Sequence, residues 1–358
     1  PTPLTTSLPR RGRDSHPASN SPAISVVVPA YNEQEVLAEF HARTVPVLEA
    51  IGLPFEVVYV NDGSRDRTLE VMLALQAADS RVAVVNLSRN FGKEIALTAG
   101  LDHAAATEAV VVIDADLQDP PEVIPDLVAA WRRGFDIAYA QRRVREGETW
   151  LKKATATGFY RVMQRLGGRV QLPANTGDFR LMSRRALDAL LTLREQHRFM
   201  KGLFAWVGFP AVPVLYDRAP RAAGTTKWNY WKLWNFSLEG ITSFTVGPLK
   251  IATYLGLVTA VFAAVFGAQI IAKTLIWGNP VAGYPSLMAV VLFLGGVQLM
   301  TLGIIGEYLG RVFNETKGRP LYFIERHIPS GEAYRQASSV PTGAQRAAPS
   351  GTSGANAA

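Results

Sequence analysis

Cysteine is absent from this sequence of 358 residues, and histidine occurs only five times. The absence of cysteine excludes disulfides, thiolate metal sites and cysteine nucleophiles. The histidines show no metal-binding spacing such as His-x-x-x-His. The glycine-rich patterns of dinucleotide-binding folds and of P-loop enzymes are also missing, so neither class is supported. Residues 1–20 lack an apolar core and do not resemble a secretory signal.

Charge and hydropathy point to a membrane and to anionic partners. The net charge is +7 and 48% of the residues are hydrophobic, with a mean hydropathy of +0.09 and an isoelectric point of about 9.6. The apolar content is high for a soluble enzyme, and the positive charge suits a nucleotide or an acidic lipid surface. Because basic residues gather beside two long apolar segments, the charge needs no nucleic-acid partner to explain it.

Short β-branched segments alternate with helical segments through the first part of the chain. We expect strands at residues 24–29, 55–60, 81–87, 109–113 and 135–140. We expect the intervening helices at residues 34–50, 67–78, 93–103 and 122–133. This alternation predicts an α/β fold with a mainly parallel sheet and helices on both faces.

Two carboxylates, Asp114 and Asp116, follow the fourth expected strand, and Gln118 lies two residues further on. In open α/β sheets, ligands bind at the carboxyl ends of the strands. Carboxylate and amide oxygens are hard ligands of the kind that Mg²⁺ or Mn²⁺ prefers. Taken alone, an Asp-x-Asp segment also fits a solvated turn, so the choice depends on the rest of the chain.

Two long segments, residues 251–272 and 284–306, contain no charged side chain. Each meets the requirement of roughly 20 residues for crossing a bilayer, so we expect a membrane hairpin; buried core helices are the alternative. The connecting loop, residues 273–283, carries one lysine. The outer flanks carry Lys227, Lys232 and Lys250 before the hairpin, and Arg311, Lys317, Arg319 and Arg326 after it. The positive-inside rule then places both termini and the α/β domain in the cytoplasm.

Two segments mix basic and aromatic residues in the way that helices at the headgroup level do. Residues 227–244 contain three tryptophans and lie next to the hairpin, so we expect an interfacial amphipathic helix there. Residues 150–166 form a second candidate. An ordinary amphipathic helix packed on the α/β domain is the alternative for both.

Four motifs stand in order at the ends of expected strands: Pro29-Ala30-Tyr31-Asn32-Glu33, Asn61-Asp62-Gly63-Ser64, Asn90-Phe91-Gly92-Lys93 and Asp114-Ala115-Asp116-Leu117-Gln118. This set resembles the family 2 glycosyltransferases and implies their nucleotide-sugar-binding, GT-A-like fold. Residues 177–181 and 221–228, with the hairpin, are similar to polyprenyl-phosphate glycosyltransferases of the bactoprenol glucosyltransferase and dolichyl-phosphate mannose synthase type. The resemblance covers about residues 24–325. Residues 196–199 depart from the Gln-x-x-Arg-Trp motif of processive synthases, which favours transfer of one sugar.

The resemblance implies a donor site that binds the nucleotide sugar through Pro29, Tyr31, Glu33, Asp62, Lys93 and Asp114. Asp62 is expected to accept the imide N–H of uracil, although its segment also reads as a turn with Gly63 at positive φ. For Lys93, a solvated lysine at a helix start is the alternative. Mg²⁺ or Mn²⁺ would be held by Asp114, Asp116 and Gln118 and would neutralise charge on the leaving diphosphate, which makes Asp116 a catalytic residue.

The acceptor implied by the resemblance is a polyprenyl phosphate, which is largely a dianion at neutral pH because its second pKa is about 6. Such an acceptor needs cationic groups, and the candidates are Arg142, Lys153, Arg221 and Lys227, with solvated surface charge as the alternative. Asp178 stands where this subfamily has its catalytic base. A dianion needs little help from a base, so Asp178 alternatively orients the acceptor or pairs with Arg180.

These interpretations divide the chain into segments: a disordered arm (1–22), a cytoplasmic glycosyltransferase domain (23–225), an interfacial helix (226–248), a transmembrane hairpin (249–312) and a cytoplasmic tail (313–358, disordered beyond about 329). The expected donor is UDP-glucose; UDP-N-acetylglucosamine, GDP-mannose or a modified pentose donor stay open. A catalytically idle membrane scaffold is the alternative from another class. Glycines along the second apolar segment permit close helix packing, so we expect a homo-oligomer.

Overall fold

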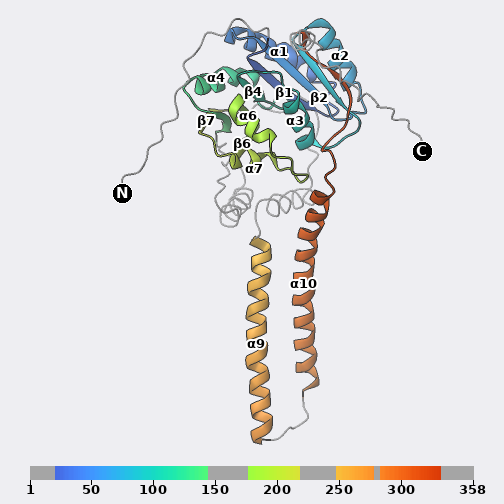
Figure 1. The fold of residues 1–358 in the computed structure, drawn as a ribbon, viewed down its shortest axis with the longest axis vertical. Helices are drawn as coiled ribbons and strands as arrows, with labels where there is room; N and C mark the ends of the chain where they lie inside the picture. The colour runs from blue at the N-terminus through green and yellow to red at the C-terminus, as the bar shows by residue number, and fades with distance from the viewer. Residues whose placement is uncertain (1–20, 144–175, 218–246, 278–282, 332–358) are drawn as a thin grey trace, which may run out of the picture.

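The computed structural model describes residues 21–143, 176–217, 247–277 and 283–331. An α/β domain occupies one end of the molecule, and two long helices extend from it side by side (Figure 1). The N-terminal arm, residues 150–166, residues 227–244 and the tail beyond residue 331 lie outside the described residues. The expectations for those segments therefore stay predictions.

Strands and helices alternate as far as β5. The order is β1 (Ile24–Ala30), α1 (Leu37–Ile51), β2 (Phe55–Asn61), α2 (Thr68–Ala78), β3 (Val82–Leu87), α3 (Lys93–Asp102), β4 (Ala109–Val112), the 3₁₀ turn η1 (Pro121–Val123), α4 (Ile124–Arg132) and β5 (Ile137–Arg142). The later elements are β6 (Thr176–Ser183), α6 (Arg184–Leu191), α7 (Met200–Trp206), β7 (Ala211–Tyr216), α9 (Gly247–Trp277), α10 (Tyr284–Thr316) and β8 (Ile324–Ile328).

All the strands join one sheet in the order β7-β5-β6-β4-β1-β2-β3-β8. The pairs β4–β1, β1–β2 and β2–β3 are parallel, as the alternating pattern predicts. β6 is antiparallel to both β4 and β5, and β8 is antiparallel to β3. The carboxyl ends of β1, β2 and β4 therefore meet at one edge of the sheet, where the motif residues follow.

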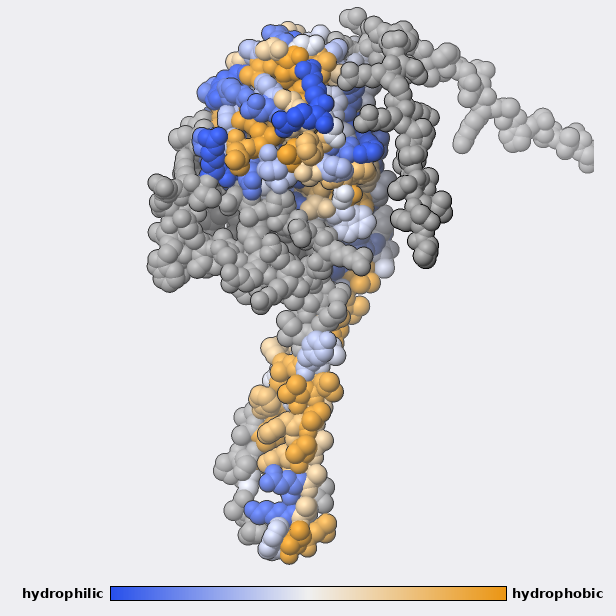
Figure 2. All heavy atoms as spheres, turned by 90° about the vertical axis from the view of Figure 1, so that its left-hand side faces the viewer, coloured by the Kyte–Doolittle hydropathy of each residue, from blue (hydrophilic) through white to orange (hydrophobic). Residues whose placement is uncertain are grey.

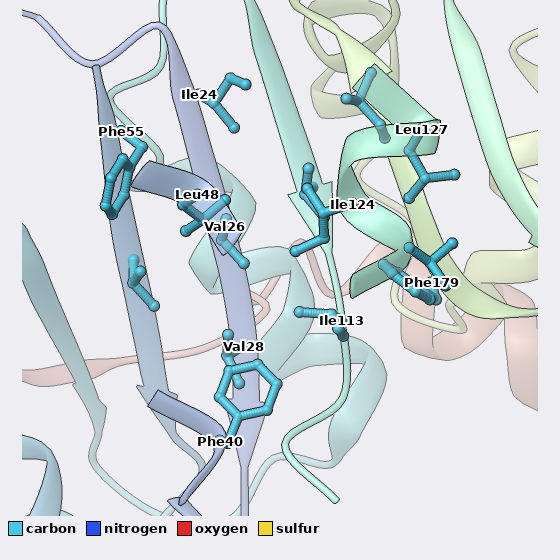
Figure 3. Close-up of a cluster of buried hydrophobic side chains, with 14 of the residues drawn as sticks. Ile24, Val26, Val28, Phe40, Leu48, Phe55, Ile113, Ile124, Leu127 and Phe179 are labelled. Atoms are coloured by element: carbon cyan, nitrogen blue, oxygen red, sulfur yellow. The ribbon is translucent and has the colours of Figure 1, made fainter. Parts of the chain in front are cut away.

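Hydrophobic side chains fill both faces of the sheet, because helices cover each of them. On one face, Val26 and Val28 of β1 pack with Phe40 and Leu48 of α1, as Figure 3 shows together with Phe179 of β6. On the other face, Val27 packs in a second cluster built from α3, α6 and α7. Burial on both faces explains why the central strands read as continuous β-branched runs rather than as alternating patterns.

The strands and helices expected as far as β5 are present, with ends shifted by up to three residues. β6, β7 and β8 were not predicted. β8 requires a correction: residues 324–328 lie in the predicted cytoplasmic tail, yet they form an edge strand of the catalytic sheet. After β8, Ser330 donates a hydrogen bond of 2.8 Å to the buried carboxylate of Glu56 on β2. The α/β domain therefore includes a segment that follows the hairpin in the sequence.

The two long helices, α9 and α10, are apolar and exposed. Residues 252–277 and 293–316 are long and apolar enough to cross a membrane by length and composition. In the most apolar 18 residues of each segment, 6% of the first and none of the second is buried in the protein. Figure 2 shows hydrophobic residues along most of this hairpin. This exposure argues against core helices. Both helices are longer than predicted, since α9 continues to Trp277 and α10 to Thr316.

Candidate active site

A cavity of about 730 Å³ opens at the carboxyl ends of the central strands. It gathers predicted residues from segments far apart in the sequence: Pro29, Tyr31, Glu33, Asp62, Lys93, Asp114, Asp116, Arg142 and Asp178. Gln118 is not among the side chains that line it. Lys153, Arg221 and Lys227 lie outside the described residues, so their predicted contacts stay predictions. Most of the expected donor site and part of the expected acceptor site therefore share one cavity.

Lys93, at the start of α3, contacts two carboxylates of this cavity that come from different parts of the chain. Its Nζ lies 2.7 Å from Asp114 Oδ2 and 2.7 Å from Asp178 Oδ2. Burial disfavours the ammonium charge, but the two carboxylates outweigh burial and hold the Lys93 pKa well above its usual range. Lys93 is therefore a cation paired with two carboxylates, while 46% of its side chain stays exposed.

Asp178 lies on β6, and only 7% of its side chain is exposed. Burial disfavours its charge, but Lys93 and Lys201 favour it more strongly, so its pKa falls to about 2. The Arg180 guanidinium donates to the carbonyl oxygens of Gly177 and Asp178 rather than to the Asp178 carboxylate, although its charge also helps to lower the Asp178 pKa. A carboxylate with so low a pKa is a weak base at neutral pH. This favours an orienting role for Asp178 over proton abstraction.

The two carboxylate oxygens of Asp178 have different surroundings. Among the residues that the structure describes, the buried Oδ1 atom has no hydrogen-bond partner, while Oδ2 is held by Lys93. A buried carboxylate oxygen without a partner is costly, so this atom is an unsatisfied acceptor on a side chain that lines the cavity. A donor group on a bound substrate, such as a sugar hydroxyl, would satisfy it.

The carboxylates at the end of β4 fit a metal ion that is shared with a substrate. The described residues hold no group of three or more acidic or histidine side chains arranged around a metal. Mg²⁺, however, is commonly held by one or two carboxylates together with substrate phosphates. Asp114 and Asp116 both line the cavity. Burial raises the pKa of Asp114, Lys93 opposes that rise, and Asp178 adds to it.

The backbone between the two metal-site candidates is turned into an unusual conformation. Leu117 has φ of +57° and is 2% exposed, a combination that is uncommon for a bulky residue. In the same turn, the Gln118 N–H donates to Asp116 Oδ1 at 3.1 Å. The tight turn keeps the Asp116 carboxylate close to its own backbone and aims it into the cavity, while Gln118 is displaced from the lining.

Asp62 has a structural role that the sequence did not reveal. Its carboxylate accepts the backbone N–H groups of Phe91 (2.7 Å) and Gly92 (3.0 Å), which precede α3. Burial raises the Asp62 pKa, and these two hydrogen bonds oppose the rise. Asp62 thereby fixes the loop that presents Lys93. It also lines the cavity, so a contact with the nucleotide is compatible with this role.

Gly63 lies where the loop after β2 touches the loop before α3. Its φ is +62°, and a Cβ atom would lie 2.4 Å from backbone atoms of Arg89 and Asn90. Gly63→Ala is therefore expected to destabilise the protein by roughly 2–4 kcal/mol, from the backbone conformation and the clash together. It should also weaken UDP binding, measured by titration calorimetry alongside thermal unfolding.

The matched control is Gly52→Ala at the end of α1. Gly52 also has a positive φ, +73°, but a Cβ atom there would meet nothing within 4 Å. This variant should lose about 1 kcal/mol from the backbone alone and bind UDP normally. Equal losses of stability and affinity in the two variants would rule out the loop contact as the cause.

Arg142 is held by a cluster that sequence analysis missed. Its Nε donates to the Tyr216 hydroxyl at 3.1 Å, and the Tyr216 hydroxyl donates in turn to the buried Asp119. Arg142 Nη2 lies 3.8 Å from Asp119 Oδ1. Burial lowers the Arg142 pKa, but Tyr216 and Asp119 outweigh it and raise the pKa. The sequence did not indicate Tyr216, because the strand that ends with this residue, β7, was not predicted.

Lys201 and Asn90 also line the cavity, and Lys201 was not predicted. Lys201 lies on the first turn of α7, outside the motifs that carry the resemblance. The signal was an isolated lysine between two apolar residues of the segment Arg198-Phe199-Met200-Lys201-Gly202. That pattern does not distinguish a cavity residue from a solvated one.

Comparison with known proteins supports the resemblance. Residues 25–191 match the model of glycosyl transferase family 2, and residues 247–312 match that of the GtrB C-terminal hairpin. The SfII prophage-derived bactoprenol glucosyl transferase of Shigella flexneri is 47% identical over 85% of this chain and 97% of its own length. The chain belongs to the family 2 glycosyltransferases. An uncharacterized glycosyltransferase of Synechocystis is 54% identical over 84% of this chain and 94% of its own length.

Among solved structures, this glycosyltransferase matches glucosyl-3-phosphoglycerate synthase from Mycobacterium tuberculosis, crystallised with Mn²⁺, UDP and phosphoglyceric acid. The identity is 22%, the TM-score is 0.44, and the match covers 62% of this chain and 76% of that one. The match to the family model and the 47% identity to the Shigella flexneri protein confirm the predicted family and the enzymatic nature of the chain, and the sheet described above confirms the α/β fold. The catalytic domain and the hairpin occur together, as the sequence motifs had indicated.

Proposed function

We propose that this glycosyltransferase moves one glucose from UDP-glucose to undecaprenyl phosphate or a similar polyprenyl phosphate. The observation that carries the proposal is the single cavity in which the Asp114–Asp116 pair, Lys93, Asp178 and Arg142 meet. Relatives named bactoprenol glucosyl transferase, 47% identical over most of their length, support the acceptor and the sugar. The hairpin would keep the enzyme in the membrane where such a lipid resides.

The donor half of the cavity would bind the nucleotide sugar through the loops after β1, β2 and β4. Asp62 would contact uracil while holding the loop before α3, and Asp114 and Asp116 would hold Mg²⁺ or Mn²⁺ with the diphosphate. The ion, when bound, would neutralise the charge that develops on the departing UDP. Lys93 would keep Asp114 and Asp178 oriented through the contacts described above.

The acceptor half would bring the lipid phosphate against the anomeric carbon. A phosphate oxygen forms the new bond to C1 while the bond from C1 to the UDP oxygen breaks, which inverts C1 in one displacement. The acceptor is already largely a dianion, so no proton has to be removed. Asp178 would then orient the sugar or the acceptor, and Arg142 would offer two parallel N–H donors to phosphate.

For the membrane arrangement, we propose that both termini and the catalytic domain face the cytoplasm, with the α9–α10 connection on the far side. The asymmetry of lysine and arginine around the hairpin supports this orientation. Glycines at positions 295, 296, 303, 306 and 310 of α10 would allow close helix packing in a homo-oligomer.

A donor and acceptor panel tests the proposal. Purified full-length enzyme with Mg²⁺ and undecaprenyl phosphate should convert radiolabelled UDP-glucose into a lipid-soluble product. UDP-N-acetylglucosamine, GDP-mannose and a nucleotide-activated pentose are tested as alternative donors. Transfer from one of them in place of UDP-glucose would change the proposed donor. Binding of UDP without transfer from any donor would indicate a catalytically idle scaffold.

A further inference from the structure

The cavity is lined by three cationic side chains in the described part of the chain, and two of them are already engaged. Lys93 pairs with Asp114 and Asp178, and Arg142 with Asp119 and Tyr216. Lys201 lines the same cavity, yet it forms no hydrogen bond or ion pair with any described residue. Carboxylates outnumber cations in the lining by five to three. Lys201 is therefore the cation most readily available to an incoming anion.

The helix that carries Lys201 is attached to the membrane hairpin. In the segment before α7, the backbone N–H groups of Gln196 and His197 both donate to Glu315 Oε1 near the end of α10, at 2.7 and 3.4 Å. In Figure 1, α7 lies on the side of the domain that faces the hairpin. The helix that carries Lys201 thus lies on the side of the domain toward the hairpin (Figure 1).

A second contact fixes α7 against the catalytic centre. The Met200 N–H donates to Glu94 Oε2 at 3.2 Å, and Glu94 directly follows Lys93 on α3. Lys201 is also close enough to Asp178 to help lower the pKa of that carboxyl. The donor-side carboxylates, by contrast, follow β2 and β4. Lys201 on α7 and Asp178 on β6 consequently line one cavity, with α7 tied both to the hairpin and to α3.

We propose that Lys201 binds the phosphate group of the polyprenyl phosphate acceptor and holds it beside Asp178. The inference rests on the proposed function, because it assigns a residue to the acceptor of that reaction. A lysine ammonium is a compact charge with three donors, which suits a phosphate monoester whose oxygens must stay free to approach the anomeric carbon. Arg142, held by Asp119 and Tyr216, would contact the same phosphate from the opposite wall or the donor diphosphate.

The test compares Lys201→Met and Lys201→Gln with the wild-type protein and with Lys317→Met. Lys317 is an exposed lysine near the end of α10, stacked on Phe313 and outside the cavity, so it controls for the loss of one charge close to the membrane. Two probes are titrated, a polyprenyl phosphate and the polyprenol of the same chain length. Affinity for UDP and the thermal midpoint show whether each variant is folded.

The wild-type protein should bind polyprenyl phosphate more tightly than the alcohol. Both Lys201 variants should lose roughly tenfold to hundredfold in affinity for the phosphate, as expected for a charged hydrogen bond, with unchanged affinity for the alcohol and for UDP. In transfer assays, KM for the lipid should rise while KM for the nucleotide sugar stays constant. Lys317→Met should behave as wild type, and Lys201→Arg should recover part of the loss.

The inference would be overturned if the Lys201 variants bound polyprenyl phosphate as tightly as the wild type. It would also be overturned if their affinities for the phosphate and the alcohol fell equally, or if the affinity for UDP fell instead. So would a wild-type protein that does not distinguish the phosphate from the alcohol. The proposed function fails separately: if no nucleotide sugar supports transfer but phosphate binding still depends on Lys201, glucosyl transfer is lost and the Lys201 assignment stands.

Discussion

Asp116→Ala is expected to reduce glucosyl transfer by roughly a thousandfold or more, because the departing UDP would lose several kcal/mol of stabilisation from the metal ion. Asp116 lines the cavity, and its carboxylate accepts the Gln118 N–H at 3.1 Å within the same turn. The thermal midpoint of the variant shows whether the fold survives the change. The measurement is the rate of lipid-linked product formation at saturating UDP-glucose across a range of Mn²⁺ concentrations.

A second readout separates metal binding from other effects. Calorimetric titration of Mn²⁺ in the presence of UDP should show weakened binding in Asp116→Ala, while UDP alone binds as to the wild type. Asp126→Ala on α4 is the matched control, since Asp126 is exposed and distant from the cavity; it should stay within about 0.5 kcal/mol of wild-type stability and keep full activity. If Asp116→Ala transferred glucose normally at low metal concentration, Asp116 would not be a metal ligand.

Asp178→Asn is expected to slow transfer by about a hundredfold or more, for a reason other than the loss of a base. The change leaves Lys93 with Asp114 as its remaining carboxylate partner among the contacts described, so Lys93 can shift toward Asp114 and compete with the metal ion. It also alters the carboxylate whose Oδ1 has no partner among the described residues. Losing a charged hydrogen bond of this kind costs roughly 1.5–3 kcal/mol, with further losses from misplaced substrate.

The measurements for Asp178→Asn are kcat, KM for the lipid and the affinity for UDP. We expect kcat to fall and UDP affinity to change by less than about threefold, because the nucleotide loops are held by Asp62 rather than Asp178. Asp188→Asn on α6 makes the same chemical change at an exposed ion pair with Arg184 and should leave the kinetics intact. Activity close to wild type in Asp178→Asn would remove this residue from the mechanism.

The predicted and observed structures agree best in the first half of the chain. Strands β1 to β4 are buried β-branched runs, and each is followed by a polar motif and a helix, so local pattern alone was enough. β6 was recognised only as the motif Gly177-Asp178-Phe179-Arg180-Leu181, because its mixture of glycine, charge and apolar residues has no clear period. Its burial comes from β4 and β5 on either side.

β8 shows the limit of local pattern most clearly. Ile324–Ile328 is a short polar edge strand, and it pairs with β3 across more than 200 residues and the whole hairpin. A prediction from sequence has no means of choosing that partner, since nothing in the five residues specifies β3 rather than solvent. The end of α10, just before β8, is also bonded to the domain, because Glu315 accepts the N–H groups of residues 196 and 197.

The amino-acid sequence was sufficient to indicate the family, the alternation of the central strands with helices, the hairpin and most of the charged residues that line the cavity, because each of these is encoded in contiguous motifs or periods. The partners of those residues depend on the folded chain. Lys93 between Asp114 and Asp178, Arg142 on Tyr216 and Asp119, and Lys201 in the same cavity as Asp178 all bring together segments separated by tens of residues. Charge pairing across such distances is set by three-dimensional packing, and no local sequence signal carries it.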